Sequence, residues 1–141
     1  MDGAAAPGMS RVDPAKGFAV DYLSNTQWHE KGLRAFLRYR DLGATKATGG
    51  AMRTEHIQAL QPVTEGTGWH CHDLDFQFVY ILKGHVAVVV PGLPETIWRA
   101  GDCAHLPPFM MHDETEFSGD FEVLEITMPA KVDTLTEAPA D

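Results

Sequence analysis

Short apolar runs follow one another along most of this chain, and several of them alternate apolar with polar residues. A period of two places alternate side chains on opposite faces of a strand, so the runs predict half-buried strands. The predicted strands cover residues 34–40, 51–60, 76–82, 85–90, 95–99 and 121–128, with Gly- and Pro-containing turns between most of them. Many short strands separated by such turns are typical of an all-β barrel or sandwich.

The ends of the chain lack this pattern. Residues 1–20 are rich in Ala, Gly and Pro, and we expect a flexible N-terminal tail there. Residues 21–130 form the predicted barrel domain, within which 113–120 reads as an acidic loop. Residues 131–141 are expected to be a loose acidic tail. A chain of 141 residues is long enough for a single domain with its own core.

Two histidines open the longest apolar run. His70 and His72 are one residue apart, so a strand would turn both imidazoles to one face, close enough to share a metal ion. Gln77 follows five residues after His72, and strict alternation would turn it away from them. It joins the histidines only if a bulge or short loop at residues 73–75 resets the register. Gly84 ends the run where the chain must turn.

A second stretch, GDCAHLPPFMMH at residues 101–112, consists of a turn, a short apolar strand, a Pro-Pro break and then His112. Together the two stretches resemble the paired motifs of the cupin superfamily. In the first motif, a His-x-His pair is followed by Glu and then Gly, and His70, His72, Gln77 and Gly84 stand at these positions. The sequence differs at one of them, since Gln77 replaces the usual metal-binding Glu.

The second motif has Gly, then Pro-x-Gly, then His, which Gly101, Pro107 and His112 match. Phe109 stands where the motif has its second glycine. The resemblance is to small single-domain cupins of the cupin-2, RmlC-like type. It implies a double-stranded β-helix, or jelly-roll barrel, that assembles as a homodimer.

The same resemblance implies one divalent metal ion held by His70, His72, Gln77 and His112. Imidazole suits Zn, Mn, Fe, Ni and Cu, so the ligand set does not choose among them. The neutral Gln77 leaves the centre more positive than a Glu would, which favours Lewis-acid chemistry and disfavours oxidation of the metal. A Gln77 that hydrogen-bonds a metal-bound water instead of binding the ion is the alternative.

Other side chains are weaker candidates for the site. Residues 51–60 can alternate in either phase, and one phase turns His56 into the cavity, although a single strand histidine is more often structural. Tyr80 and Met110 are possible pocket residues that would equally suit a core. Glu114 could act as a base at the mouth, but acidic loop residues are usually solvated. No catalytic residue is assigned.

Composition excludes several classes of partner. The formal net charge of −9 argues against nucleic acid, because phosphate contacts need clustered Lys and Arg. No apolar run approaches the ~20 residues of a membrane span, and the start of the chain does not read as a secretion signal. Two cysteines do not make a disulfide framework, which favours a cytoplasmic location.

The leading functional hypothesis is a metal-dependent enzyme with isomerase, lyase or cyclase-like chemistry on an oxygen-rich small molecule. A small cupin with Gln among its histidine ligands looks similar to polyketide-cyclase-type members of the superfamily, which fits a Lewis-acid role without redox chemistry. The second hypothesis is a metal-dependent dioxygenase, which the resemblance also allows. The third is a cupin that binds or senses a ligand without turnover.

Overall fold

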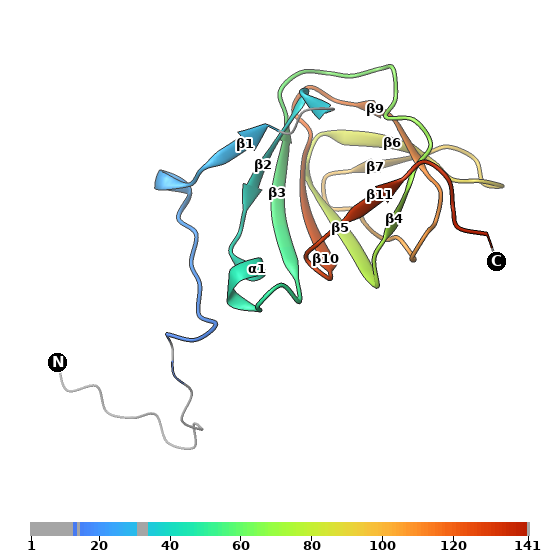
Figure 1. Ribbon diagram of the computed structural model, residues 1–141. Helices are drawn as coiled ribbons and strands as arrows, with labels where there is room; N and C mark the ends of the chain where they lie inside the picture. The colour runs from blue at the N-terminus through green and yellow to red at the C-terminus, as the bar shows by residue number, and fades with distance from the viewer. Residues whose placement is uncertain (1–12, 14, 31–33, 141) are drawn as a thin grey trace.

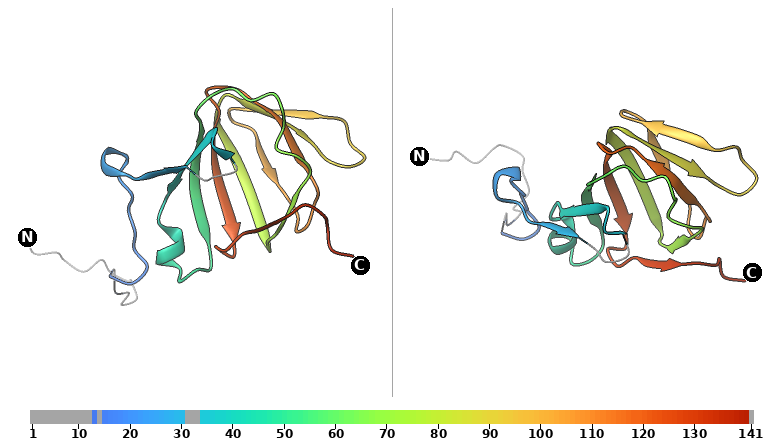
Figure 2. Two further views of the ribbon diagram at one scale, coloured as in Figure 1. Left: turned by 45° about the horizontal axis from the view of Figure 1, so that its top comes forward. Right: turned by 90° about the horizontal axis from the view of Figure 1, so that it is seen from above.

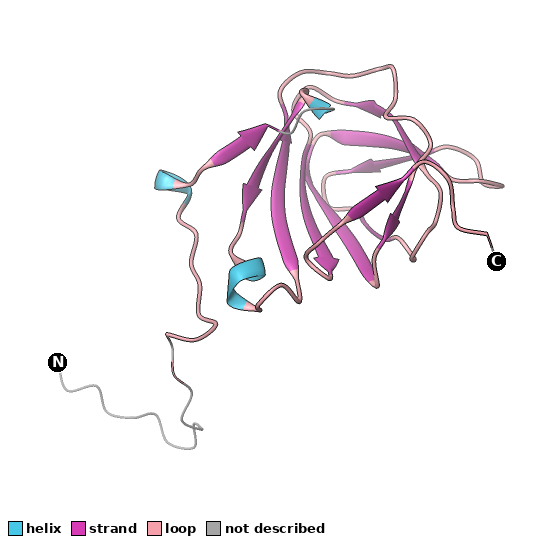
Figure 3. Cartoon of the chain, in the orientation of Figure 1, coloured by secondary structure: helices cyan, strands magenta, loops and turns pink. Residues whose placement is uncertain are grey.

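The computed structural model describes residue 13 and residues 15–30 and 34–140, and most of the regular secondary structure in these ranges is strand (Figure 3). The strands are β1 (Trp28–Glu30), β2 (Leu37–Asp41), β3 (Arg53–Ala59), β4 (Cys71–Asp73), β5 (Phe76–Lys83), β6 (His85–Val89), β7 (Thr96–Arg99), β8 (Cys103–His105), β9 (Asp113–Phe117), β10 (Glu122–Met128) and β11 (Asp133–Leu135). A 3-10 turn, η1 (Leu23–Asn25), and one short helix, α1 (Ala44–Ala47), precede β3. No helix in the described ranges has the length and apolar character needed to cross a bilayer.

Three antiparallel sheets make up the barrel (Figure 1). The largest has six strands in the order β1-β2-β3-β10-β5-β8, the second is β7-β6-β9, and β11 pairs with β4 as a third. Figure 2 shows the sheets curving around a common interior, while residues 15–27 extend away from them. The all-β fold class predicted from the sequence is confirmed, with the architecture of a double-stranded β-helix.

Alternation along the strands fills this interior. On β5, Gln77, Val79 and Ile81 are buried, whereas Tyr80 and Leu82 between and beyond them are exposed. Ile81 is among the largest fully buried side chains, and it packs in a core cluster with residues of β2, β3, β6, β9 and β10. The apolar pattern of the sequence therefore marks the inward face of the barrel.

Two segments differ from the sequence prediction. The segment expected to be an acidic loop, residues 113–120, contains strand β9, and Phe117 at the end of that strand is buried. Pairing with β6 holds these acidic residues in an extended strand. The expected C-terminal tail contains β11, which pairs with β4 from Asp133 opposite Asp73 to Leu135 opposite Cys71. Of the expected N-terminal tail, residues 1–12 and 14 lie outside the described residues.

Gly84 forms the tight connection between β5 and β6. Its φ is +67°, and an added Cβ would lie 2.2 Å from Ser118 Oγ and 2.9 Å from the backbone nitrogen of Phe121. A side chain here would meet both a left-handed backbone penalty and a clash with backbone. Gly92, with φ +81°, has nothing within 4 Å of the same position.

We therefore expect Gly84→Ala to lower the free energy of unfolding by more than ~2 kcal/mol, since overpacking adds to the backbone strain. Gly92→Ala is the matched control and carries only the backbone penalty of about 1 kcal/mol. Urea denaturation of both variants measures the difference. Equal losses would show that the contacts around Gly84 do not constrain the turn.

Candidate metal centre

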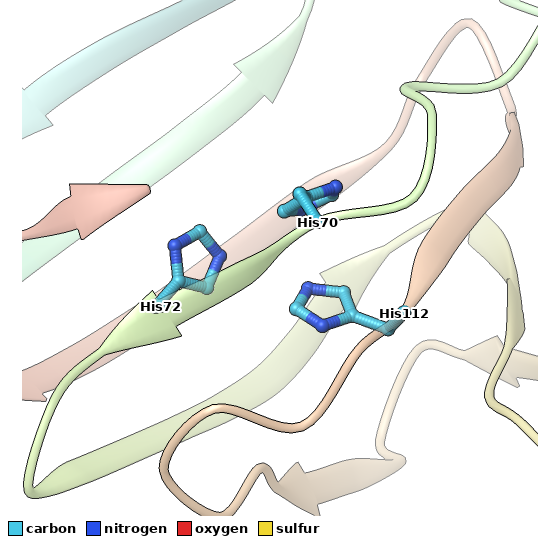
Figure 4. A group of neighbouring side chains, drawn as sticks. All are labelled: His70, His72 and His112. Carbon is cyan, nitrogen blue, oxygen red and sulfur yellow. The ribbon is translucent and has the colours of Figure 1, made fainter. Parts of the chain in front are cut away.

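Three imidazoles meet at one end of the barrel interior (Figure 4). His70 lies just before β4, His72 lies on β4, and His112 directly precedes β9. One ring nitrogen from each lies within 4.8 Å of the other two. The ring centroids are 4.3 Å apart for His70 and His112, and 5.1 Å apart for His70 and His72. The structure thus brings together the three histidines that the sequence predicts as ligands.

A backbone bridge sets this arrangement. His70 N–H donates to the carbonyl oxygen of His112 at 3.0 Å, and His112 N–H donates to the carbonyl oxygen of His70 at 2.8 Å. The two residues therefore face each other as an antiparallel pair, which places their side chains on one side of the bridge. His72 shares that side because it is two residues along the chain from His70.

Each histidine has a hydrogen-bond partner at Nδ1. His70 Nδ1 donates to the carbonyl oxygen of Gly68 at 2.6 Å, and His112 Nδ1 donates to that of Met110 at 2.9 Å. His72 Nδ1 lies 3.0 Å from Thr134 Oγ1 on β11. A carbonyl fixes the proton on Nδ1 and leaves the lone pair on Nε2 for a metal, which is how bound histidines are usually oriented.

The environment also disfavours protonation of His70 and His72. Burial, followed by the nearby His112 and His70, lowers the pKa of His72 to about 4. Burial is likewise the main reason that the pKa of His70 lies below its ordinary value, although Glu114 opposes the shift. A neutral imidazole is the form that binds a metal, so the ring environment suits a metal ligand at neutral pH.

The fit of a metal can be judged from the remaining nitrogens. His112 Nε2 is buried and has no hydrogen-bond partner among the described residues, although buried polar atoms are nearly always paired. Arg34 Nη2 donates to His70 Nε2 at 3.2 Å, so that nitrogen carries a lone pair. Three imidazoles grouped in this way fit a divalent first-row ion.

Gln77 reaches the same cavity from β5, because β4 ends at Asp73 and β5 starts at Phe76 as a separate strand. The break in register predicted at residues 73–75 is therefore present. Gln77 is buried, and its Nε2 donates to Glu125 Oε2 at 3.3 Å. That bond fixes the orientation of the amide, and whether its oxygen binds the ion stays a prediction.

Glu114 also points into the centre, from β9. Its Oε2 lies 3.4 Å from His70 Nε2, and its Oε1 lies 3.8 Å from His112 Nε2. The hydroxyl of Thr67 donates to Oε2 at 2.6 Å. Burial opposes ionisation, but His112, His70, Arg34 and Thr67 together hold the pKa of Glu114 below its ordinary value. A carboxylate anion is therefore fixed beside two histidine nitrogens.

The centre opens on a cavity of about 760 Å³. Apolar side chains form much of its wall, among them Ile57, Val79, Ile81, Val86, Phe117 and Val123. The polar lining also includes a cluster in which Arg53 Nη2 contacts Glu125 Oε1 at 2.6 Å. Burial raises the pKa of the nearby Tyr39 to about 12, so its phenol stays protonated at neutral pH. Such a cavity is the usual form of a small-molecule site.

The three possible pocket residues lie elsewhere. His56 faces outward, where it is 2.8 Å from Glu122 and stacks edge-on against Trp28 at 5.2 Å. Strand β3 has the opposite phase, so Arg53 and Ile57 line the cavity instead. Tyr80 is 41% exposed on the outer face of β5. Met110 packs against the core, and it is its backbone carbonyl that orients His112.

Several residues of the site have no signal in the sequence. Thr134 lies in a segment that reads as a tail, and Arg34 in a segment that reads as an edge strand. Arg53 and Glu125 lie on predicted strands, but charged residues there equally suit an outward face. Arg53 and Glu125 could have been identified only if the inward face of each strand had been known.

The fold and the site together define a class: a small β-barrel with a three-histidine centre at the end of an apolar cavity. A family model described as "Cupin domain" matches residues 56–127, and the chain belongs to this family. The resemblance to the cupin superfamily predicted from the two motifs is confirmed.

Solved structures with the same fold share little sequence with this chain. KdgF from Halomonas sp. is 15% identical with a TM-score of 0.64, and the match covers 80% of this chain and 96% of that one. The polyketide cyclase RemF from Streptomyces resistomycificus is 14% identical with a TM-score of 0.64, covering 94% and 88%. A protein described as a predicted oxalate decarboxylase from Thermotoga maritima is 20% identical with a TM-score of 0.63, covering 79% and 99%. The search of curated proteins finds no match.

The contact from β11 makes a prediction about Thr134. Replacing Thr134 by Val removes the hydroxyl beside His72 Nδ1 but keeps the shape, and we expect zinc affinity to fall about tenfold, the usual loss when a partner of a ligand histidine is removed. Thr136→Val, a cavity-lining change without that contact, is the control. Competition with a fluorescent zinc chelator measures both; equal affinities would mean that β11 does not orient His72.

Proposed function

We propose that this chain is a metal-dependent enzyme that acts on an oxygen-rich small molecule by non-redox acid–base chemistry, in the class of isomerases, lyases or cyclases. One observation carries the proposal. One ring nitrogen from each of His70, His72 and His112 lies close to the other two, where an apolar cavity meets the hydrogen-bonded pair of Gln77 and Glu125. A pocket of this kind combines a cation site with groups able to orient a substrate.

Each part of the cavity has a physical task in this proposal. His70, His72 and His112 hold the ion, with Gln77 as the fourth candidate ligand. A bound divalent ion supplies Lewis acidity, which polarises a carbonyl or hydroxyl oxygen. The apolar walls exclude water and so strengthen the electrostatic interactions of the polar groups.

Glu125, together with Gln77 and Arg53, forms a polar part of the cavity wall. Glu125 accepts from Gln77 and pairs with Arg53, so its two oxygens are held in fixed directions. Burial raises the pKa of Glu125, whereas Arg53 opposes that shift. These groups and the phenol of Tyr39 offer donors and acceptors to the hydroxyl and carbonyl groups of a polyoxygenated substrate.

The comparisons support this proposal only at the level of fold, because each of the three reported structures is at most 20% identical to this chain. Among these relatives RemF is named as a polyketide cyclase, a ring-forming enzyme. The metal-dependent dioxygenase remains the second candidate, because a three-histidine ligand set also suits iron, copper or nickel. A cupin that binds a ligand without turnover is the third.

The experiment is elemental analysis of untagged protein purified without added metal. We expect one equivalent of zinc or manganese, lost on replacement of His112 by Ala. His105→Ala is the control, because His105 is an exposed residue of β8 and lies outside the cavity.

Other outcomes change the conclusion. One equivalent of iron, copper or nickel, with oxygen uptake that depends on a candidate substrate, would place the dioxygenase first. Absence of metal from all forms, including protein refolded with zinc, would contradict the proposal and favour the ligand-binding cupin.

Two expectations accompany the proposal. By family resemblance we expect a homodimer, and the low cysteine content favours a cytoplasmic location. Both stay predictions. Gel filtration with light scattering would measure the first.

A further inference from the structure

We propose that Glu114 supplies the carboxylate ligand of the metal centre, from β9, in place of the carboxylate that Gln77 lacks on β5. This inference rests on the proposed metal centre and identifies one more of its ligands. It concerns a residue outside the two sequence motifs, two positions beyond His112.

Distances are the first argument. The Glu114 oxygens lie 3.4 Å from His70 Nε2 and 3.8 Å from His112 Nε2. Both are longer than a good hydrogen bond of about 2.7–3.2 Å. Ligand bonds of about 2.0–2.2 Å place two atoms of one ion roughly 3.0–3.5 Å apart. The 3.4 Å separation lies within this range and the 3.8 Å separation lies just beyond it, so a small shift of the carboxylate would give the spacing of ligands on a shared ion. His112 Nε2 has no hydrogen-bond partner among the described residues.

A second argument is that Glu114 is held in place. Its Oε2 accepts from the Thr67 hydroxyl at 2.6 Å, and its own backbone N–H donates to that hydroxyl at 3.2 Å. Thr67 N–H in turn donates to the Glu114 carbonyl oxygen at 2.9 Å. Adjacent Asp113 accepts from the N–H groups of Thr67 and Gly68 at 3.1 Å each. The loop that presents His70 and the strand that presents Glu114 are thus tied to each other.

The third argument is charge. Three imidazoles and an amide are all neutral, so an ion held by them alone would keep its full charge inside an apolar barrel. Burying an uncompensated charge is strongly unfavourable. Ionised Glu114 reduces the net charge of the centre from +2 to +1. The sequence alone predicts that the neutral Gln77 leaves the centre more positive than a Glu would. With Glu114 as a ligand, the centre instead has the charge of a site with three histidines and one carboxylate, and the carboxylate comes from another strand.

The test compares Zn²⁺ affinity and Co²⁺ absorption spectra of metal-free protein and its variants. We expect Glu114→Gln to weaken zinc binding by at least about tenfold, no less than the loss of an outer partner of a ligand. We also expect it to change the visible bands of the Co²⁺ form, because these report the atoms bound to the ion. Glu114→Ala should give at least the same loss.

Glu116→Gln is the matched control, since Glu116 lies on the same strand but is exposed and pairs with His85 at 2.9 Å. The double variant Glu114→Gln with Gln77→Glu returns a carboxylate to β5, and we expect it to recover most of the affinity. Thermal unfolding of every metal-free variant checks that each one folds.

The outcomes separate this inference from the proposed function. If His112→Ala abolishes binding while Glu114→Gln and Glu114→Ala keep wild-type affinity and Co²⁺ spectrum, the inference is wrong and the three-histidine centre stands. If affinity falls but the spectrum does not change, Glu114 acts only as a nearby charge and is not a ligand. If wild-type protein binds neither Zn²⁺ nor Co²⁺, both proposals fail.

Discussion

The backbone bridge between His70 and His112 is the contact on which the centre depends. These residues are far apart in the sequence, and each comes from a different motif, yet they exchange two hydrogen bonds of 3.0 and 2.8 Å. The bridge is isolated and flanks the strands β4 and β9 without belonging to either. Regular strand pairing stops at this bridge. The side chains of His70 and His112 therefore lie at the edge of the cavity, where a bound ion would be accessible from it.

Oriented imidazoles follow from local chain geometry. In His70 and His112 the Nδ1 partner is the carbonyl oxygen two residues earlier, so the same segment that positions the ring also fixes its proton. His72 lacks such a local partner and depends on Thr134, which β11 brings from the far end of the chain. The C-terminal strand is therefore part of the centre, although the histidines come from the motifs.

Sequence alone predicted the parts of the site that depend on spacing. His70 and His72 share a face because their separation is two, and Gln77 rejoins them because residues 73–75 break the register, as the odd offset required. The second motif located His112. The glycine position of that motif is occupied by Phe109, which still adopts a φ of +60°, so the backbone shape persists without the residue that favours it.

What the sequence did not predict depends on pairing between distant strands. The phase of β3 is set by its register with β2 and β10, and this register turns His56 outward to Glu122 and Arg53 inward to Glu125. Glu114 read as a solvated loop residue because acidic residues surround it, and the pairing of β9 with β6 was not visible in that composition. The local pattern divides the residues of a strand between two faces. Pairing with the neighbouring strands then determines which of the two faces points into the barrel.

Charge is distributed unevenly across the cavity, and this bears on its chemistry. Glu125 is paired with Arg53 at 2.6 Å, so its charge is compensated by protein. Glu114 faces two histidine nitrogens, and burial disfavours its anion unless a cation is near. Arg34 and a metal ion would compete for the same lone pair on His70 Nε2, because a lone pair serves one partner at a time. The end of the cavity at the histidines therefore offers a carboxylate and ring nitrogens to a cation, whereas Glu125 is already paired with Arg53.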